Sequence, residues 1–323
     1  MNQSHGHLLE VVDLTVHFPV RRGLRRRSVV HALDGVSITV PRGSTVGVVG
    51  ESGSGKTTLG RAILRRVDPI AGTIWFDGTN LTDLAGESLR RFRVRMQSIP
   101  QDPHGSLNPR HRILSANAEP LVAHNLVTND SEATERVAEL LAWVGLSPDA
   151  MHDFPSSFSG GQLQRVVIAR ALAVNPELVI ADEAVSALDV SIQAQVINLM
   201  QDLQDRMGVA YLFISHDVSV VRHIADTVVV MYAGKVVESG NCETVLSHPV
   251  HPYTEALIAS VPGTDSGRRG RVTILNGEPP DPTDPPSGCR FRTRCPHAQE
   301  ICTEVEPLLV EKSQGHFSAC WLR

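Results

Sequence analysis

The sequence of 323 residues lacks any long hydrophobic run and any excess of basic charge. No apolar stretch approaches the roughly 18 to 20 residues that a membrane-spanning helix needs. The first residues, MNQSHGHLLEV, lack the charged and then apolar pattern of a secretory signal. The formal net charge of -5 argues against a protein that binds nucleic acid through a basic surface. We therefore expect a soluble, cytoplasmic polypeptide with no nucleic-acid partner.

Cysteine is scarce until the end of the chain. Cys242 stands alone and reads as an ordinary core or surface thiol, whereas Cys289, Cys295, Cys302 and Cys320 all fall in the last 35 residues. Because the cytosol keeps thiols reduced, this clustering indicates metal ligation before disulfides. The spacing C-x5-C-x6-C-x17-C suits a 4Fe–4S cluster or zinc. Zinc sites usually contain tighter C-x2-4-C pairs, which are absent, and unmetallated thiols are the third possibility.

The order of apolar segments predicts an α/β protein with a mainly parallel sheet. Two β-rich segments, 8–18 and 29–40, flank a basic loop, and a continuously apolar strand follows at 44–50. The pattern is helical over about 103–174, where Ser131 is the predicted N-cap of one helix. Strands and helices then alternate until the composition shifts after about residue 262. We therefore predict one domain over 1–265 and a Pro-rich, Cys-bearing extension over 266–323.

A phosphate-binding loop follows the apolar strand at 44–50. Residues 50–57, GESGSGKT, match G-x-x-x-x-G-K-[ST] at every fixed position, after a buried strand and before a helix. The glycines allow backbone N–H groups to turn around the phosphates, and the start of the helix adds positive dipole. Lys56 is predicted to reach the β- and γ-phosphates, and the Thr57 hydroxyl is predicted to bind Mg²⁺.

Two further motifs narrow the function. The strand 178–182 ends in Asp182, which is predicted to hold Mg²⁺ through water, and Glu183 follows where it can activate the attacking water. Ser159-Gly160-Gly161-Gln162 opens a helix and forms a second anion site. Two chains packed head to tail could bring both anion sites to one γ-phosphate.

With these motifs in order, the chain resembles an ATP-binding-cassette (ABC) ATPase, a P-loop NTPase with a RecA-like core. The resemblance implies an N-terminal antiparallel β subdomain, a helical subdomain over about 103–174 and the cysteine-containing extension. It makes Gln101 the Q-loop residue that senses the γ-phosphate and contributes to Mg²⁺ binding, and His216 the switch histidine. Phe18 is implied to stack on adenine, with His17 and the region around His31 as substitutes. The implied catalytic residues are Glu183, His216, Gln101 and Lys56. The residues implied to bind nucleotide are Phe18, Gly50, Ser52, Gly53, Gly55, Lys56, Thr57, Thr58, Gln101, Asp182, Ser159, Gly160, Gly161, Gln162 and Asp189.

A narrower resemblance is to the ATPase subunits of oligopeptide and dipeptide importers, and specifically to the second, F-type ATPase. It rests on QDPHGSLNPR, SALDVSIQAQVINLMQDLQ, HPYTEALIASVP and PPSGCRFRTRCPHA, and it covers nearly the whole chain. Two positions depart from the usual pattern. Phe158 replaces the common Leu before the signature, and Ala184 replaces the Pro after the catalytic Glu.

This resemblance implies a peripheral protein on the cytoplasmic face of the membrane. Its implied partners are a second ABC ATPase, forming a heterodimer, two transmembrane permease subunits and an extracytoplasmic substrate-binding protein. Related ATPases carry a cluster at this tail, which favours iron–sulfur over zinc. Nickel, glutathione or another small solute are alternative cargoes, and a soluble ABC ATPase of DNA repair or translation is a further alternative. Because the cysteines lie far along the chain from the ATP-handling residues, we expect their role to be structural.

Overall fold

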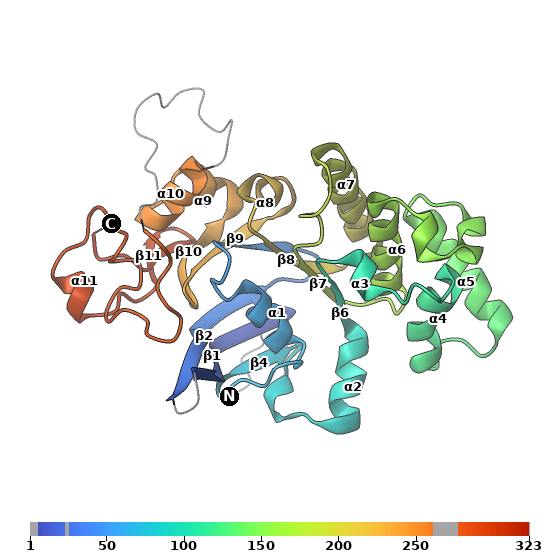
Figure 1. The fold of residues 1–323 in the computed structure, drawn as a ribbon, viewed down its shortest axis with the longest axis horizontal. Helices are drawn as coiled ribbons and strands as arrows, with labels where there is room; N and C mark the ends of the chain where they lie inside the picture. Colours follow the sequence, from blue (N-terminus) through green and yellow to red (C-terminus); the bar gives the residue numbers. More distant parts are fainter. Residues whose placement is uncertain (1–5, 23–25, 261–276, 323) are drawn as a thin grey trace. The chain divides into compact units, whose positions relative to one another are not determined.

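Strands and helices alternate along the computed structural model, which describes residues 6–22, 26–260 and 277–322 (Figure 1). They form two compact units. The first comprises Met1–Pro41, Thr45–Asp83 and Ile214–Arg323, and the second comprises Arg42–Ser44 and Leu84–Phe213. The two ends of the sequence therefore belong to the same unit. The predicted domain boundary at residue 265 and the tip of the basic loop lie outside the described residues.

An antiparallel sheet with the strand order β2-β1-β4-β5 forms the N-terminal part of the first unit. Side chains alternate along a strand, so Leu9 and Val11 of β1 are buried while Val12 is exposed. The pairing register of β1 with β2 shifts after Val11, where Asp13 adopts a positive φ of 50°. This bulge changes which positions face the core. The strands are β1 (Leu9–Arg22), β2 (Arg26–Val40), β4 (Ala71–Phe76) and β5 (Thr79–Asn80).

A second sheet runs through the first unit in the order β11-β12-β10-β9-β3. All five residues of β3 are buried, as expected for a parallel strand covered on both faces. The C-terminal extension supplies β11 and β12, and Glu238 of β10 pairs with Ser318 of β12. The extension is thus joined to the cassette by a β-ladder. The strands are β3 (Thr45–Val49), β9 (Thr227–Tyr232), β10 (Lys235–Asn241), β11 (Val310–Ser313) and β12 (His316–Ser318).

Helices cover these strands in the first unit. Helix α8 lies so close to β3 that a Cβ atom at Gly47 would stand 2.3 Å from Cγ1 of Val221. A glycine is therefore required at this position by the approach of the helix. The helices are α1 (Lys56–Ile63), η1 (Leu81–Asp83), α8 (Val218–Ile224), α9 (Cys242–Ser247), α10 (Pro252–Ala259) and α11 (Ile301–Glu304). Cys242 is buried at the start of α9, which confirms the reading of a core thiol.

The second unit contains the strand order β8-β7-β6 and most of the helices. Its helix α5 begins after Asn129, whose side chain accepts a hydrogen bond from the Glu132 N–H at 3.0 Å. The predicted N-cap Ser131 is wrong, because it lies inside the first turn of that helix. The strands are β6 (Met96–Ile99), β7 (Leu178–Asp182) and β8 (Ala210–Ser215). The helices are α2 (Gly86–Arg95), α3 (Pro103–Ser106), α4 (Ile113–Ala123), α5 (Asp130–Trp143), η2 (Pro148–His152), η3 (Pro155–Ser157), α6 (Gly160–Leu172) and α7 (Val190–Met207). None of the described helices has both the length and the apolar character needed to cross a bilayer.

Candidate functional site

The phosphate loop joins β3 to α1 in the first unit. Its glycines Gly50, Gly53 and Gly55 have φ angles of 154°, 81° and 103°. A Cβ atom at Gly50 would also lie 2.2 Å from the backbone oxygen of Met231. Only glycine accepts these conformations and this contact without strain. These conformations are the ones that a phosphate-binding loop of this motif requires.

Lys56 folds back over this loop. Its ammonium donates hydrogen bonds to the backbone oxygens of Gly50 at 2.7 Å and Glu51 at 2.9 Å. It also lies 3.4 Å from Oγ of Ser54. The side chain is buried and ordered by the loop itself. A positive charge is thus held at the loop, where it can pair with a phosphate.

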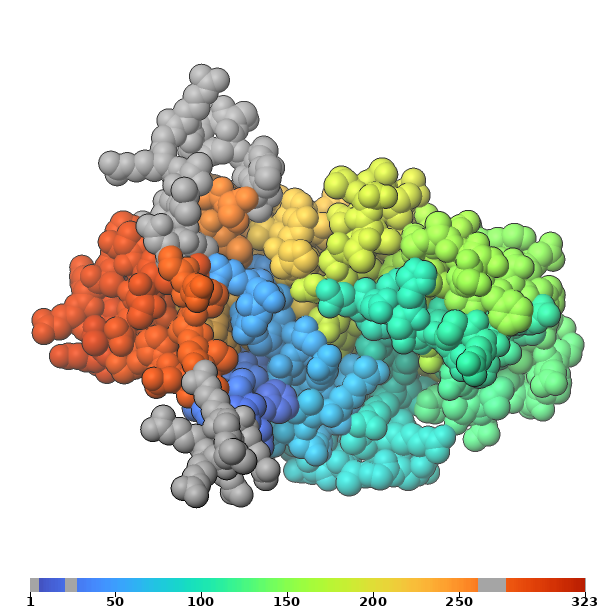
Figure 2. Space-filling view, in the orientation of Figure 1, coloured from blue at the N-terminus to red at the C-terminus, as the bar shows by residue number. Residues whose placement is uncertain are grey.

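The phosphate loop opens on a cavity of about 250 Å³. One wall is formed by the loop residues Glu51 to Ser54, and another by Pro279 to Pro282 of the C-terminal extension. In the space-filling view the orange and red residues of the extension lie directly against blue residues of the same unit (Figure 2). The extension therefore borders the phosphate site. The expectation of a purely structural tail, based on its distance in sequence, missed this contact.

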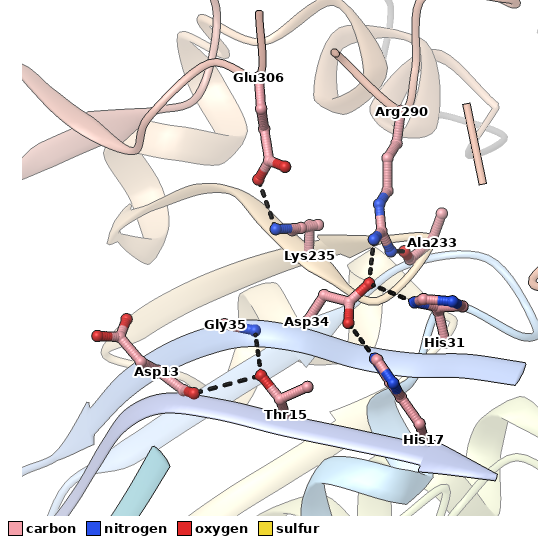
Figure 3. Close-up of polar contacts among 10 residues, drawn as sticks. All are labelled: Asp13, Thr15, His17, His31, Asp34, Gly35, Ala233, Lys235, Arg290 and Glu306. Atoms are coloured by element: carbon pink, nitrogen blue, oxygen red, sulfur yellow. Dashed lines mark hydrogen bonds and ion pairs between the residues drawn. The ribbon is translucent and has the colours of Figure 1, made fainter. Parts of the chain in front are cut away.

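The candidates for adenine stacking lie on the paired strands β1 and β2. Phe18 is half-buried and pairs with Val30. His17 and His31 pair across the same ladder, and each contacts a carboxylate oxygen of Asp34 (Figure 3). His31, unlike Phe18, lines the cavity at the phosphate loop. The choice between these rings remains a prediction.

His17, His31 and Asp34 also form the only group of three potential metal ligands found within 4.8 Å among the described residues. The guanidinium of Arg290 contacts the same carboxylate of Asp34 (Figure 3). A bound cation would have to compete with this guanidinium for Asp34. We therefore describe the group as an ion-paired network that involves the extension.

In the second unit the structure brings Gln101 and Glu183 together. Strands β6 and β7 pair in parallel with Ile99 opposite Ala181. The residues two positions beyond these, Gln101 and Glu183, are therefore neighbours. The side-chain amide of Gln101 donates a hydrogen bond of 2.8 Å to Oε2 of Glu183. Glu183 has a positive φ of 50°, a conformation that costs energy outside glycine. Asp182 ends β7 directly before it.

The signature residues begin α6. Ser159 and Gln162 form a capping box, in which the Gln162 N–H donates to Oγ of Ser159 and the Ser159 N–H donates to Oε1 of Gln162. A Cβ atom at Gly161 would lie 2.5 Å from Cγ2 of Ile192. Gly161 thus permits close packing of α6 against α7. The anion site expected at the start of α6 remains a prediction.

The remaining predicted residues stand at the ends of elements. Asp189 is the N-cap residue of α7, and its backbone oxygen accepts a hydrogen bond from the Gln193 N–H at 2.8 Å. His216 follows β8 and is exposed. Asp217 caps α8 by accepting a hydrogen bond from the Ser219 N–H at 2.8 Å. Thr57 and Thr58 lie in the first turn of α1.

The four cysteines of the extension are free thiols. Cys302 is buried and the other three are half-buried, and the Cys289 N–H donates a hydrogen bond of 2.8 Å to the Cys302 oxygen. Burial raises the pKa of Cys289 to about 11, and the charges of the other three cysteines act in the same direction. Cysteine sulfur is a ligand for iron–sulfur clusters and for zinc, and metal binding at these four residues remains a prediction.

Solved structures of known function resemble this fold. The structure of cbiO1 from Clostridium perfringens, part of an ABC transporter complex, matches with a TM-score of 0.65 and 25% identity, over 76% of this chain and 92% of that chain. The ATP-binding cassette MJ0796, in a dimeric post-hydrolysis state bound to ADP and phosphate, matches with a TM-score of 0.64 and 27% identity, over 72% of this chain and 98% of that chain. Residues 33–186 match the ABC transporter family model. The fold and the site thus define an ABC ATPase.

Relatives in sequence specify the branch of this class. The Oligopeptide transport ATP-binding protein AppF of Bacillus subtilis is 51% identical over 321 residues, which cover 98% of this chain and 97% of the relative. A putative peptide import ATP-binding protein of Brucella ovis is 48% identical over 97% of both chains. Residues 237–302 match the oligopeptide/dipeptide transporter C-terminal region. The chain belongs to the family of ATP-binding proteins of oligopeptide and dipeptide transporters.

Proposed function

We propose that this protein is the ATP-hydrolysing subunit of an ABC importer and that it powers the uptake of oligopeptides or dipeptides. The main support is the 51% identity to an oligopeptide transport ATP-binding protein over 98% of the chain. The match of 237–302 to the transporter C-terminal region adds independent support. Nickel and glutathione are alternative cargoes, because the ATPase itself need not touch the solute.

The residues required for hydrolysis are present. In this proposal the ammonium of Lys56 pairs with the phosphates of ATP, and Thr57 and Asp182 are the residues that would hold the accompanying Mg²⁺. Glu183 accepts the proton of the attacking water. The amide of Gln101 donates to Glu183, and this bond orients the carboxylate.

The partners follow from the class of protein. A cassette of this type presents its signature helix to the nucleotide of a second cassette, and permease subunits carry the solute across the membrane. We propose that the second ATPase is a different chain, that two permease subunits and an extracytoplasmic binding protein complete the importer, and that this subunit sits on the cytoplasmic face of the membrane. Closure of the two cassettes on ATP then shifts the permease between its inward- and outward-facing states.

We further propose that Cys289, Cys295, Cys302 and Cys320 bind a 4Fe–4S cluster. A zinc ion with Zn–S bonds of about 2.3 Å would hold its thiolates within about 4 Å of one another. A cubane cluster is larger than a single ion and holds its cysteines further apart. The spacing C-x5-C-x6-C-x17-C, which lacks the tighter C-x2-4-C pairs usual in zinc sites, favours iron–sulfur over zinc.

The function is tested with the complete importer reconstituted in lipid vesicles. Glu183→Gln should lower ATP turnover by about 10²- to 10⁴-fold and leave ATP binding intact, because only the water-activating group is lost. Lys56→Ala should abolish hydrolysis because the phosphate charge loses its partner. Glu243→Gln, which alters an exposed carboxylate paired with Arg222 at 2.7 Å, is the matched control.

Peptide-stimulated ATPase activity and peptide uptake are the readouts. Normal turnover by Glu183→Gln would refute the catalytic assignment. If nickel or glutathione stimulated the ATPase activity and peptides did not, the peptide cargo would be refuted in favour of that solute.

A further inference from the structure

The segment between the first two cysteines of the extension contacts the phosphate loop. Arg294 forms a two-pronged ion pair with Glu51, the second residue of that loop. Nη1 of Arg294 lies 2.7 Å from Oε2 of Glu51, and Nη2 lies 3.0 Å from Oε1. The side chain of Arg294 is 5% exposed and that of Glu51 is 24% exposed. Charged hydrogen bonds of this parallel geometry are among the strongest in proteins, and partial burial protects them from solvent.

Glu51 is held from several directions at once. Its backbone N–H donates a hydrogen bond of 2.8 Å to the hydroxyl of Tyr253, and its backbone oxygen accepts one from Lys56. Arg294 also lies 3.3 Å from the hydroxyl of Tyr232. The ion pair is therefore part of a network that includes the phosphate-binding lysine.

An aromatic cluster anchors the same segment beneath the loop. Phe291 of the extension is buried, and its ring meets Tyr232 edge-on with a centroid distance of 5.2 Å. Its distance to the ring of Tyr253 is 5.5 Å. Aromatic pairs in this arrangement add to the stabilisation from burial alone. The position of Arg294 is thus set by a packed core rather than by a flexible surface chain.

A second arginine of the segment bonds to β2 and to the turn between β9 and β10. Arg290 donates to the backbone oxygen of Ala233 and contacts Asp34 (Figure 3). The backbone oxygen of Pro282 accepts a hydrogen bond of 2.8 Å from the His31 N–H. The extension is therefore fixed at three places around the cavity.

The charge of Glu51 gives the ion pair a consequence for nucleotide binding. An unpaired carboxylate in the phosphate loop would repel the phosphates of ATP. The guanidinium of Arg294 neutralises this carboxylate and holds it in one position. Its removal should weaken nucleotide binding even though Arg294 belongs to the extension.

We propose that Arg294 is a positioning residue for the phosphate loop and that it couples the four-cysteine site to nucleotide affinity. Arg294 immediately precedes Cys295, so a metal bound there would fix the backbone from which Arg294 extends. Coupling between two sites is reciprocal, so nucleotide should also favour retention of the metal. The coupling rests on the proposed metal centre, whereas the action of Arg294 on the loop does not.

The first test measures the dissociation constant of a fluorescent ATP analogue on the full chain. Arg294→Gln should raise this dissociation constant by about tenfold. Arg294→Lys should raise it less, because lysine keeps the positive charge but cannot form the two parallel hydrogen bonds of the guanidinium. The double variant Arg294→Gln with Glu51→Gln should bind nearly as well as wild type, since the repelling carboxylate is gone. Arg292→Gln is the control, because Arg292 carries the same charge in the same segment and bonds to Ser287 within the extension.

A merely structural role predicts a different pattern. It would lower thermal stability in both the single and the double variant, with no rescue by Glu51→Gln. Binding by Arg294→Gln within twofold of wild type, failure of the double variant to restore binding, or an equal loss in Arg292→Gln would overturn the proposal. In the assembled importer the positioning role predicts a raised KM for ATP with kcat within about twofold.

The second test concerns the coupling. Iron and zinc are quantified in anaerobically purified protein, and loss of the metal to a chelator is followed with and without ATP. Slower loss with ATP in wild type, abolished in Arg294→Gln, supports the coupling. Equal rates refute it. Protein that contains neither metal refutes both the coupling and the proposed metal centre, while the test with Glu51→Gln still decides the role of Arg294.

Discussion

Replacement of Glu238 by alanine should destabilise the first unit more than any surface change. The side chain of Glu238 is 0% exposed. Its Oε1 accepts hydrogen bonds from the Val250 N–H at 2.6 Å and from Nε2 of His316 at 2.7 Å. Its Oε2 accepts one from the His251 N–H at 3.0 Å. One carboxylate thus connects β10, the start of α10 and strand β12 of the extension.

The magnitude follows from the groups that would be left behind. Alanine leaves two backbone N–H donors without an acceptor. The buried donor of His251 costs about 1 to 3 kcal/mol when unsatisfied, and the half-buried donor of Val250 costs less. With the bond to His316 also lost, we expect the free energy of unfolding to fall by about 3 to 5 kcal/mol. Glu238→Gln retains one acceptor oxygen and should cost less.

Urea unfolding and amide hydrogen exchange measure this effect. Exchange should accelerate at Val250 and His251, the two donors that lose their partner. Glu243→Gln is the control, because an exposed ion pair contributes little to stability. A loss below about 1 kcal/mol in Glu238→Ala, with unchanged exchange at these amides, would refute the reasoning.

Two pH-dependent predictions accompany this one. Burial alone would raise the pKa of Asp34, but hydrogen bonds and charges from His17 and Arg290 outweigh it and lower the pKa. The stabilisation is therefore present above the ordinary carboxyl pKa of about 4. This stabilisation is lost as the pH falls through the lowered pKa of Asp34 in the folded protein. Proteolysis of the extension should therefore accelerate in acid in the wild type, and Asp34→Asn should lose this acid dependence. Burial raises the pKa of Cys242 to about 11. Alkylation of Cys242, followed by mass spectrometry, should therefore be slow at neutral pH and faster in alkali. Alkylation at neutral pH as fast as that of a free cysteine would contradict this prediction.

The local chemistry of the site could be predicted from the sequence. The glycines of 50–57 match a motif because the loop conformation is local, and the structure gives all three the positive φ that the motif implies. The neighbouring positions of Gln101 and Glu183 were not predicted, because they depend on the pairing of β6 with β7 in the folded sheet. A second exception is the N-cap of α5. Asn129 and Ser131 are both residue types that favour this position, and the structure shows that Asn129 occupies it.

The contacts of the extension could not be predicted in the same way. Arg294 and Glu51 are 243 positions apart, and neither hydrophobic periodicity nor motif spacing records a contact over that distance. The arginines between Cys289 and Cys295 were visible in the sequence as charges. Their partners became apparent only when the fold brought both ends of the chain into one unit.

The distance between Arg294 and Glu51 also has a consequence for biosynthesis. A ribosome makes the phosphate loop long before it makes the arginine that holds it, and domains begin to fold as they emerge. A nascent cassette therefore carries its ATP-binding motif without the anchor, and a chain truncated before residue 289 never acquires it. If Arg294 positions the phosphate loop as proposed, chains that stop before this residue would bind ATP more weakly than chains that include it.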